Sequence, residues 1–244
     1  MAGKAQWRED LAELDRSSWP EFLDEHSGLP GPRANIDLAM AVAEVADAEL
    51  VESLLASGDE YRIFCGTLAL GVRAAEPGVE ARLRMLATDE RWRVREAVAI
   101  GLQRLGDADL AALESLVLDW AGDADPLVQR AAAAAICEPR LLRSPQAAAV
   151  AIDVCRLATT SLAGRPQSTR REPGVRSLRQ GLGYCWSVAV AADPDPGLAA
   201  FGALDGRDPD LVWIISQNRR KKRLARLLDQ SELASSHQPH RTAG

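Results

Sequence analysis

This 244-residue sequence contains only three histidines, and it lacks paired cysteines and nucleotide-binding glycine motifs. Two of the three histidines, His237 and His240, fall in the last eight residues, and the third is His26. No C-x-x-C pair, P-loop, G-x-G-x-x-G motif after a strand or G-x-S-x-G elbow occurs. We therefore expect no cofactor and no metal, and we interpret the four cysteines as small core residues in a reducing compartment.

Long apolar runs are also missing. The first 24 residues mix charged and apolar side chains throughout, unlike a secretory signal. Charges interrupt even the most apolar stretches, so we expect none to approach the roughly 20 residues that a membrane-spanning helix requires. These absences predict a soluble, cytoplasmic protein that does not contact a membrane.

Aromatic residues make up only 5% of the chain, whereas alanine and leucine recur throughout. This bias favours helices over strands. Charge is uneven: residues 1–150 carry 15 basic and 26 acidic side chains, and residues 151–244 carry 14 and 9. Because the first part is strongly acidic, we expect only the C-terminal part to attract phosphate.

Apolar residues recur at helical spacing along most of the chain. They predict helix pairs at 38–55, 64–86, 89–122 and 125–162, an amphipathic helix at 175–192, a short one at 198–204, and a last one from 209 towards 228. A loop is expected at 164–174. Four aspartates at predicted helix starts are interpreted as caps that accept hydrogen bonds from free backbone N–H groups: Asp89, Asp107, Asp123 and Asp208.

The helix pattern repeats. Residues 59–71 align with 89–101 at an offset of 30, which places Gly71 in register with Gly101. Residues from 89 onward align with those from 123 at an offset of 34. Helix pairs that recur every 30 to 40 residues or so are typical of a stacked array.

The segment DPLVQRAA at 125–132 resembles the start of a HEAT repeat, and RWRVREAV at 91–98 and DPDLVWI at 208–214 resemble degenerate copies. The segments QGLGYCWSVAVA at 180–191 and WII at 213–215 are similar to the C-terminal repeats of bacterial HEAT-repeat proteins that have no established activity. With the helix pattern, the resemblance implies an all-α fold, an armadillo-type α-solenoid of about five HEAT-like helix pairs. We expect an N-terminal capping segment at 1–34, the solenoid at 35–229 and a disordered tail at 230–244.

Aromatic and basic residues supply candidates for a binding surface. Trp92 stands between two arginines, an arrangement that suits recognition of a peptide, a carboxylate or a nucleic acid. Trp213 is a second candidate, whereas Trp186 lies on an apolar stripe and is expected to be buried. The arginines near these helix starts are expected either to pair with carboxylates of neighbouring repeats or to face a ligand: Arg93, Arg95 and Arg130.

The densest charge cluster is a run of five cations: Arg219, Arg220, Lys221, Lys222 and Arg223. The run could bind phosphate. We prefer the interpretation that it complements the negative end of a helix dipole and caps an open end of the solenoid.

These features favour a non-catalytic scaffold that binds a macromolecule, with another protein as the first choice of partner. The alternative is a nucleic-acid-binding protein that uses the basic C-terminal half, such as a HEAT-repeat alkylpurine DNA glycosylase. The resemblance implies this alternative because one bacterial family that excises alkylated bases is built from such repeats. A third hypothesis is a lyase-like role on a bilin-bearing protein, since some phycobilin lyases use related repeats. The oligomeric state is left open.

Overall fold

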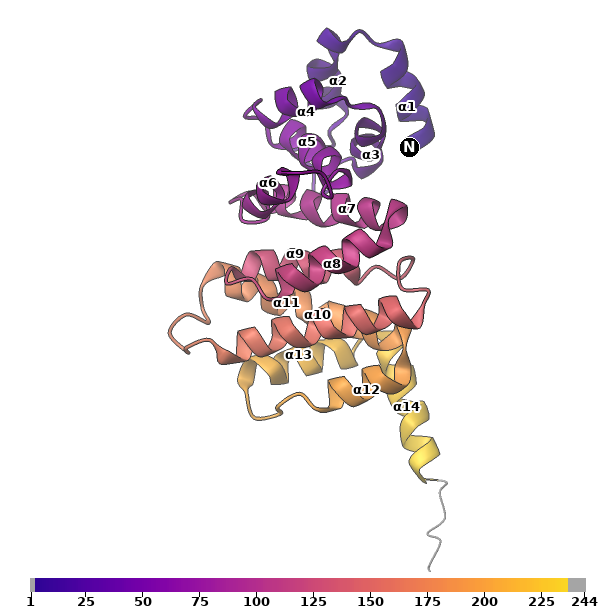
Figure 1. Cartoon of the computed structure of the whole chain (residues 1–244), viewed down its shortest axis with the longest axis vertical. Coiled ribbons are helices and arrows are strands. Elements are labelled where there is room, and N and C mark those ends of the chain that lie inside the picture. Colours follow the sequence, from indigo (N-terminus) through magenta and orange to yellow (C-terminus); the bar gives the residue numbers. More distant parts are fainter. Residues whose placement is uncertain (1–2, 237–244) are drawn as a thin grey trace, which may run out of the picture. The chain divides into compact units, whose positions relative to one another are not determined.

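The computed structural model describes residues 3–236, and in that part of the chain it contains fourteen α-helices, one short 3-10 helix and no strand (Figure 1). This confirms the all-α prediction. The chain divides into two compact units, Met1–Leu113 and Glu114–Gly244, and the division falls inside α8 (Leu110–Ala121). The units carry different charge: the first has 12 basic and 21 acidic residues, and the second has 17 and 14.

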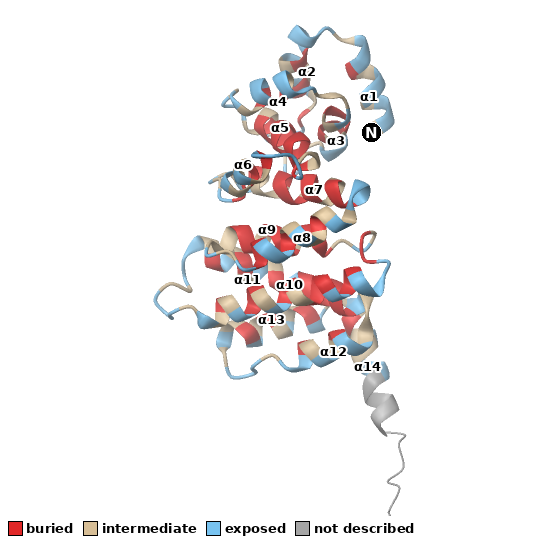
Figure 2. Cartoon of the chain, viewed as in Figure 1, coloured by how far each residue is buried: buried red, intermediate tan, exposed pale blue. Residues whose placement is uncertain are grey.

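Unit 1 is built around α5, which packs against α3, α4 and α7. Figure 2 shows buried residues concentrated on α5 and α7, where Phe64, Leu68 and Val98 are fully buried. The helices of this unit are α1 (Lys4–Glu13), η1 (Arg16–Ser18), α2 (Trp19–His26), α3 (Ile36–Val45), α4 (Ala48–Leu55), α5 (Glu60–Val72), α6 (Val79–Leu86) and α7 (Trp92–Ala108).

The two glycines in register mark a close crossing of α5 and α7. A Cβ on Gly71 would lie 2.6 Å from the Gly101 Cα, and one on Gly101 would lie 2.7 Å from the Leu68 carbonyl oxygen. The helices therefore touch backbone to backbone, which leaves no room for a side chain at either position. Because α5 continues to Val72, packing explains Gly71 better than helix termination.

The predicted cap at Asp107 is wrong. Asp107 lies inside α7, where it pairs with Arg104 at 2.8 Å. The backbone becomes extended only at Asp109, and its Oδ1 accepts a hydrogen bond from the Ala112 N–H at 3.0 Å. Because a cap requires an extended backbone ahead of the first turn, α8 begins two residues later than the pattern indicated.

The other predicted caps differ in detail. Asp208 caps α13 as predicted, since its Oδ1 accepts from two backbone N–H groups of the first turn. Asp125, not Asp123, caps α9, and Asp123 supports the preceding turn by accepting from the Asp125 N–H. Asp89 has a similar supporting role because α7 begins only at Trp92.

Unit 2 is built around α11, which packs against α9, α10, α12, α13 and α14. Trp186 on α11 is fully buried, as predicted, and its Nε1 donates to the Thr159 Oγ1 at 2.9 Å. Five of its helices start with proline, which suits the first helical position. The helices after α8 are α9 (Pro126–Ile136), α10 (Pro145–Gly164), α11 (Pro173–Ala192), α12 (Pro194–Gly202), α13 (Pro209–Arg219) and α14 (Lys222–Ser236).

The single helix predicted from 209 towards 228 is two helices. α13 ends at Arg219 and α14 begins at Lys222, so the break falls inside the run of five cations. Like charges on successive turns of one continuous helix would repel one another, and the break separates them. α14 continues to Ser236, past the start of the predicted tail at 230, while residues 237–244 lie outside the described part. The predicted division at residues 34 and 35 stays a prediction.

One helix is more apolar than the sequence analysis expected. Among residues 3–236, α10 alone is long and apolar enough to cross a membrane by length and composition. More than half of its apolar window is buried inside the protein. Because α10 packs against α9, α11 and α12, its composition is that of a core helix.

The side chain of Asn218 joins α13 to α11. Its Nδ2 donates to the carbonyl oxygens of Leu182 and Ile214 at 2.9 and 2.8 Å, and its Oδ1 accepts from the Ser187 N–H at 2.8 Å. Asn218 is fully buried, so these three bonds satisfy the amide where water cannot.

We expect Asn218→Leu to lower the free energy of unfolding by about 2 kcal/mol, because it removes three buried hydrogen bonds, two of which join α13 to α11. Urea denaturation measures this change. Ser216→Ala on the exposed side of α13 is the control and should change stability by less than about 0.5 kcal/mol. Equal stability of both variants would show that the amide does not join the helices.

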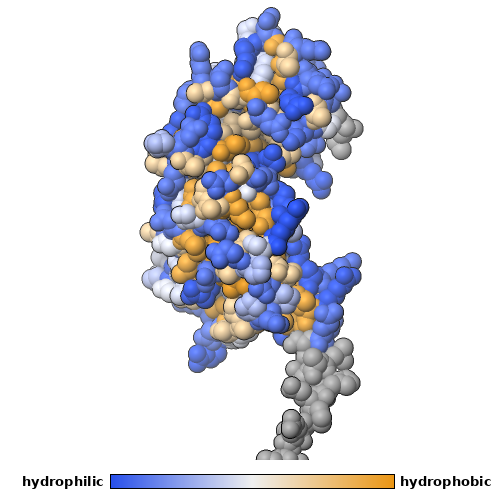
Figure 3. All heavy atoms as spheres, turned by 45° about the vertical axis from the view of Figure 1, so that its right-hand side comes forward, coloured by the Kyte–Doolittle hydropathy of each residue, from blue (hydrophilic) through white to orange (hydrophobic). Residues whose placement is uncertain are grey.

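Large hydrophobic side chains also reach the surface between hydrophilic ones, as the face in Figure 3 shows. Those exposed in the described part of the chain are Ile36, Met85, Trp92, Leu118, Tyr184 and Val212. Two of them, Trp92 and Tyr184, have cations against their rings. Exposed aromatic rings therefore occur beside basic side chains in both units.

Candidate functional site

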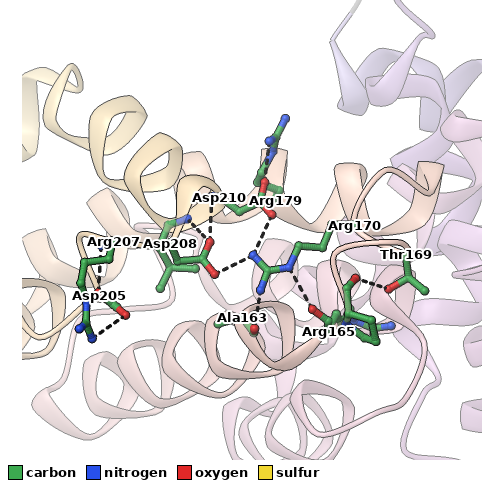
Figure 4. A network of polar contacts seen from close by, with 11 residues as sticks. Ala163, Arg165, Thr169, Arg170, Arg179, Asp205, Arg207, Asp208 and Asp210 are labelled. Atoms are coloured by element: carbon green, nitrogen blue, oxygen red, sulfur yellow. Dashed lines mark hydrogen bonds and ion pairs between the residues drawn. The ribbon is translucent and has the colours of Figure 1, made fainter.

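The loop between α10 and α11 is held in place by the guanidinium group of Arg170 (Figure 4). Its Nη1 donates to Asp208 at 2.6 Å and to Asp210 at 3.2 Å. Its Nε donates to the Arg165 carbonyl oxygen at 3.0 Å, and its Nη2 donates to that of Ala163 at 2.5 Å. Only 8% of the Arg170 side chain is exposed, so this arginine connects the loop to the start of α13 and is not available to a ligand.

Asp208 is held in its charged form. Burial raises its pKa, but hydrogen bonds from Arg170 and from two backbone N–H groups outweigh burial and lower the pKa below its ordinary value of 3.8. A lowered pKa in the folded state stabilises the fold above the pKa of the unfolded state. That stabilisation is lost as the pH falls through the pKa of the folded state.

Unit 2 should therefore become less stable on acidification, and Asp208 should account for part of the loss. We expect the free energy of unfolding to fall between about pH 5 and about pH 2, and to fall less steeply in Asp208→Asn, which cannot titrate. Urea denaturation of both proteins across this range measures the two slopes. Identical slopes would contradict a lowered pKa at Asp208.

Arg179 on α11 joins the same network from the other side. Its Nη1 donates to the Asp210 Oδ1 at 2.7 Å, and its guanidinium carbon lies 4.7 Å from the centre of the Trp213 ring. The ring also packs against α11, since a Cβ on Gly183 would lie 2.8 Å from it. Close packing of the Trp213 ring against α11 therefore explains Gly183.

Beside this network the surface of unit 2 is hollowed, with a volume of about 550 Å³. We call this feature the arginine hollow; it is lined by Gln167, Ser168, Arg170, Arg171, Arg176, Arg179, Pro209 and Asp210. Four of these residues are cations and one is an anion. The volume lies within the range of small-ligand sites, but the lining is far more polar than that of most of them.

The cations of the arginine hollow differ in what they contact. Arg170 and Arg179 are neutralised by Asp208 and Asp210. Arg171 and Arg176 are exposed, and the described part of the chain places no carboxylate against either. Arg171 and Arg176 are thus the cations that the hollow offers to an anion.

Two cations of the run at residues 219–223 contact the ring of Tyr184. Lys221 Nζ and Arg223 Cζ each lie 5.4 Å from the centre of the Tyr184 ring, and Arg223 Nη2 donates to the Tyr184 hydroxyl at 3.1 Å. We call Tyr184, Lys221 and Arg223 the Tyr184 cluster. Arg219 complements the C-terminal end of α13, but Lys222 and Arg223 lie at the start of α14, where the helix dipole disfavours cations. Dipole compensation therefore accounts for only part of the run.

The predicted site residues of unit 1 contact other groups of the same unit. Trp92 is 48% exposed, as its flanking arginines indicated, and the Arg93 guanidinium lies 4.7 Å from its ring centre. Arg93 also pairs with Glu60 on α5 at 3.4 Å. Arg95 donates to the backbone carbonyl groups of residues 89 and 90. Arg93 and Arg95 therefore stabilise the start of α7.

The predicted site residues of unit 2 only partly come together. Arg130 on α9 packs its side chain beside Gly181, and Trp213 lies under Arg179 next to the arginine hollow. Arg171, Arg176 and Arg179 were not predicted as site residues. A sequence signal was present, because residues 165–179 contain five arginines and one acidic residue.

Three of the four cysteines meet in the core of unit 2. The Sγ atoms of Cys137 and Cys155 lie 3.7 Å apart, and Cys185 is a further neighbour of Cys137. A hydrogen bond to the neighbouring thiol, together with burial, raises the pKa of Cys137 and of Cys185 well above the usual range. The thiols are therefore protonated and unreactive, consistent with core residues. Within residues 3–236, no group of three or more His, Cys, Asp or Glu side chains is placed to hold a metal ion; His237 and His240 lie outside the described residues.

No family model, curated protein or solved structure matches the chain.

Proposed function

We propose that the chain is a non-catalytic scaffold that binds another protein, and that unit 2 provides the binding surface. The observation that carries the proposal is a set of cations in unit 2 against which the described residues place no carboxylate. These cations are Arg171 and Arg176 at the arginine hollow and residues 219–223, of which Lys221 and Arg223 contact Tyr184. Complementary charge across an interface gives a partner both specificity and fast association.

The proposed scaffold is an α-solenoid of about five HEAT-like helix pairs. In unit 1 α5 packs against α3 and α7, and in unit 2 α11 packs against α9 and α13. In both units, therefore, helices that are two positions apart in the chain pack against one another, as the helices of successive stacked pairs do. Contacts between residues 30 positions apart support the same arrangement: Glu52 with Arg82, Gly71 with Gly101, and Gly183 with Trp213.

A protein partner is better supported than a nucleic acid. A DNA glycosylase would use aromatic side chains such as Trp92, Trp186 and Trp213 to contact bases, but Trp186 is fully buried and hydrogen-bonded to Thr159. The Trp213 ring is packed against Gly183 and Arg179. Stacking on bases needs a free ring face, and of the three only Trp92, which is in the acidic unit 1, is half exposed.

Affinity capture from native lysate tests the proposal. The intact chain should retain a protein in stoichiometric amount, and a variant with residues 219–223 changed to glutamine should lose it. Arg156→Gln with Arg207→Gln is a control that removes two charges from unit 2, because both arginines are exposed and pair only with nearby aspartates. Stoichiometric nucleic acid, or no macromolecule under several conditions, would contradict the proposal. Release of a base from alkylated duplex DNA by the purified chain would contradict its non-catalytic part.

A further inference from the structure

The arginine hollow and the Tyr184 cluster lie along one helix. Arg176 and Tyr184 are eight residues apart on α11, which corresponds to about 12 Å along the helix axis. Both face the elements that follow α12: the hollow includes Asp210 on α13, and Tyr184 contacts Lys221, between α13 and α14, and Arg223, at the start of α14. An extended ligand could therefore contact both.

Both ends offer cations that no carboxylate of the described residues contacts. In the arginine hollow, two aspartates serve Arg170 and Arg179, which leaves Arg171 and Arg176. The neighbouring Gln167 and Ser168 add an amide and a hydroxyl that can donate hydrogen bonds. In the Tyr184 cluster, the contacts of the two cations in the described part of the chain are with the ring and its hydroxyl.

We propose that the two ends form one site for an extended acidic segment of a partner protein. The inference rests on the proposed function and specifies the chemistry of the partner. Arg171 and Arg176 bind side-chain oxyanions at one end, since guanidinium groups match carboxylate and phosphate geometry. The Tyr184 cluster binds acidic side chains about four residues further along, because an extended chain advances about 3.3 Å per residue.

One observation favours a peptide over a nucleic acid at this site. The aromatic rings nearby, Trp213 and Tyr184, both have cations against them. They therefore offer no ready stacking surface for bases.

Fluorescence titration of the full chain with short labelled peptides tests the inference. The first peptide, Glu-Glu-Gly-Ser-Glu-Glu, has acidic pairs whose centres are four residues apart. The second, Glu-Glu-Glu-Glu-Gly-Ser, has the same composition, but its acidic run spans at most about 10 Å, which is shorter than the separation of about 12 Å between the two ends. We expect the first to bind more tightly. A third peptide, with phosphoserine in place of the outer glutamates, identifies which oxyanion the site prefers.

Matched variants separate this site from general charge attraction. Arg171→Gln with Arg176→Gln, and separately Lys221→Gln with Arg223→Gln, should each weaken binding of the first peptide about tenfold. Arg156→Gln with Arg207→Gln removes the same charge elsewhere on unit 2 and should leave affinity within about twofold. Because Arg171 and Arg176 are exposed, circular dichroism should show an unchanged fold in the first variant.

Three results would overturn the inference: equal affinity for the two glutamate peptides, an equal loss in the control variant, or tighter binding of a single-stranded oligonucleotide of matched charge. These failures differ from failure of the proposed function. If the intact chain captures a protein but both glutamate peptides bind with equal affinity, the proposed scaffold function is supported and the proposed peptide site is contradicted.

Discussion

Replacing Arg170 by alanine is expected to lower the free energy of unfolding of unit 2 by about 3 to 5 kcal/mol. The substitution leaves Asp208 and Asp210, each only 15% exposed, without the guanidinium that both contact. It also removes the donors to the carbonyl groups of Ala163, in the last turn of α10, and of Arg165, in the loop before α11. Breaking a buried ion pair from one side costs more than the pair itself contributes, because the remaining charges stay desolvated.

Urea denaturation at neutral and acidic pH checks this expectation. At neutral pH Arg170→Ala should be far less stable than the intact chain, and the difference should shrink at low pH, where protonation removes the charge of both carboxyl groups. Arg207→Ala is the matched control: its side chain is 92% exposed and pairs with Asp205, so its loss should stay within about 0.5 kcal/mol. A pH-independent or equally small loss at Arg170 would show that the network does not hold the loop.

The second large effect is expected at the crossing of α5 and α7. Gly101→Ala should lower the free energy of unfolding of unit 1 by about 3 kcal/mol. Its Cβ would lie 2.7 Å from the Leu68 carbonyl oxygen and 2.8 Å from the Gly71 Cα, and backbone atoms cannot move aside as a flexible side chain can. The helices would have to separate and lose core contacts along their length.

Gly202→Ala on α12 is the control for glycine replacement in a helix. No atom lies within 4 Å of the added Cβ, so only helix propensity changes, and stability should be retained or rise by up to about 1 kcal/mol. Thermal and urea denaturation of both variants compare the two positions. If Gly101→Ala is as stable as the intact chain, the backbone contact is not the reason for glycine in this register.

The helices could be predicted from the sequence wherever apolar spacing and capping residues agreed. α9 to α12 lie close to their predicted ranges because apolar residues recur at helical spacing along each of them, although α11 and α12 begin at Pro173 and Pro194, before the predicted starts at 175 and 198. The break between α13 and α14 was missed because neither glycine nor proline marks it. The cap of α8 was misplaced because Asp107 and Asp109 both fit the pattern, and only the extended backbone at Asp109 distinguishes them.

The candidate site was harder to predict, because its contacts join residues far apart in the chain. Arg170 reaches Asp208 and Asp210 across 38 and 40 residues, so no local pattern reports the pairing. Trp213 was a candidate because it is an aromatic residue near a predicted helix start, but in the structure its ring packs against Gly183 and Arg179. The excess of positive charge at residues 165–179, where five arginines accompany one acidic residue, was the local signal that could have indicated the site.

The most direct test of the central claim is the dissociation constant between this chain and the protein that affinity capture recovers. It should be measured for the intact chain and for Arg171→Gln with Arg176→Gln at one ionic strength. We predict about tenfold weaker binding in the variant, with an unchanged unfolding temperature and no loss in the Arg156 and Arg207 control. Equal dissociation constants for the intact chain and the hollow variant would contradict the claim that these unneutralised cations of unit 2 bind the partner.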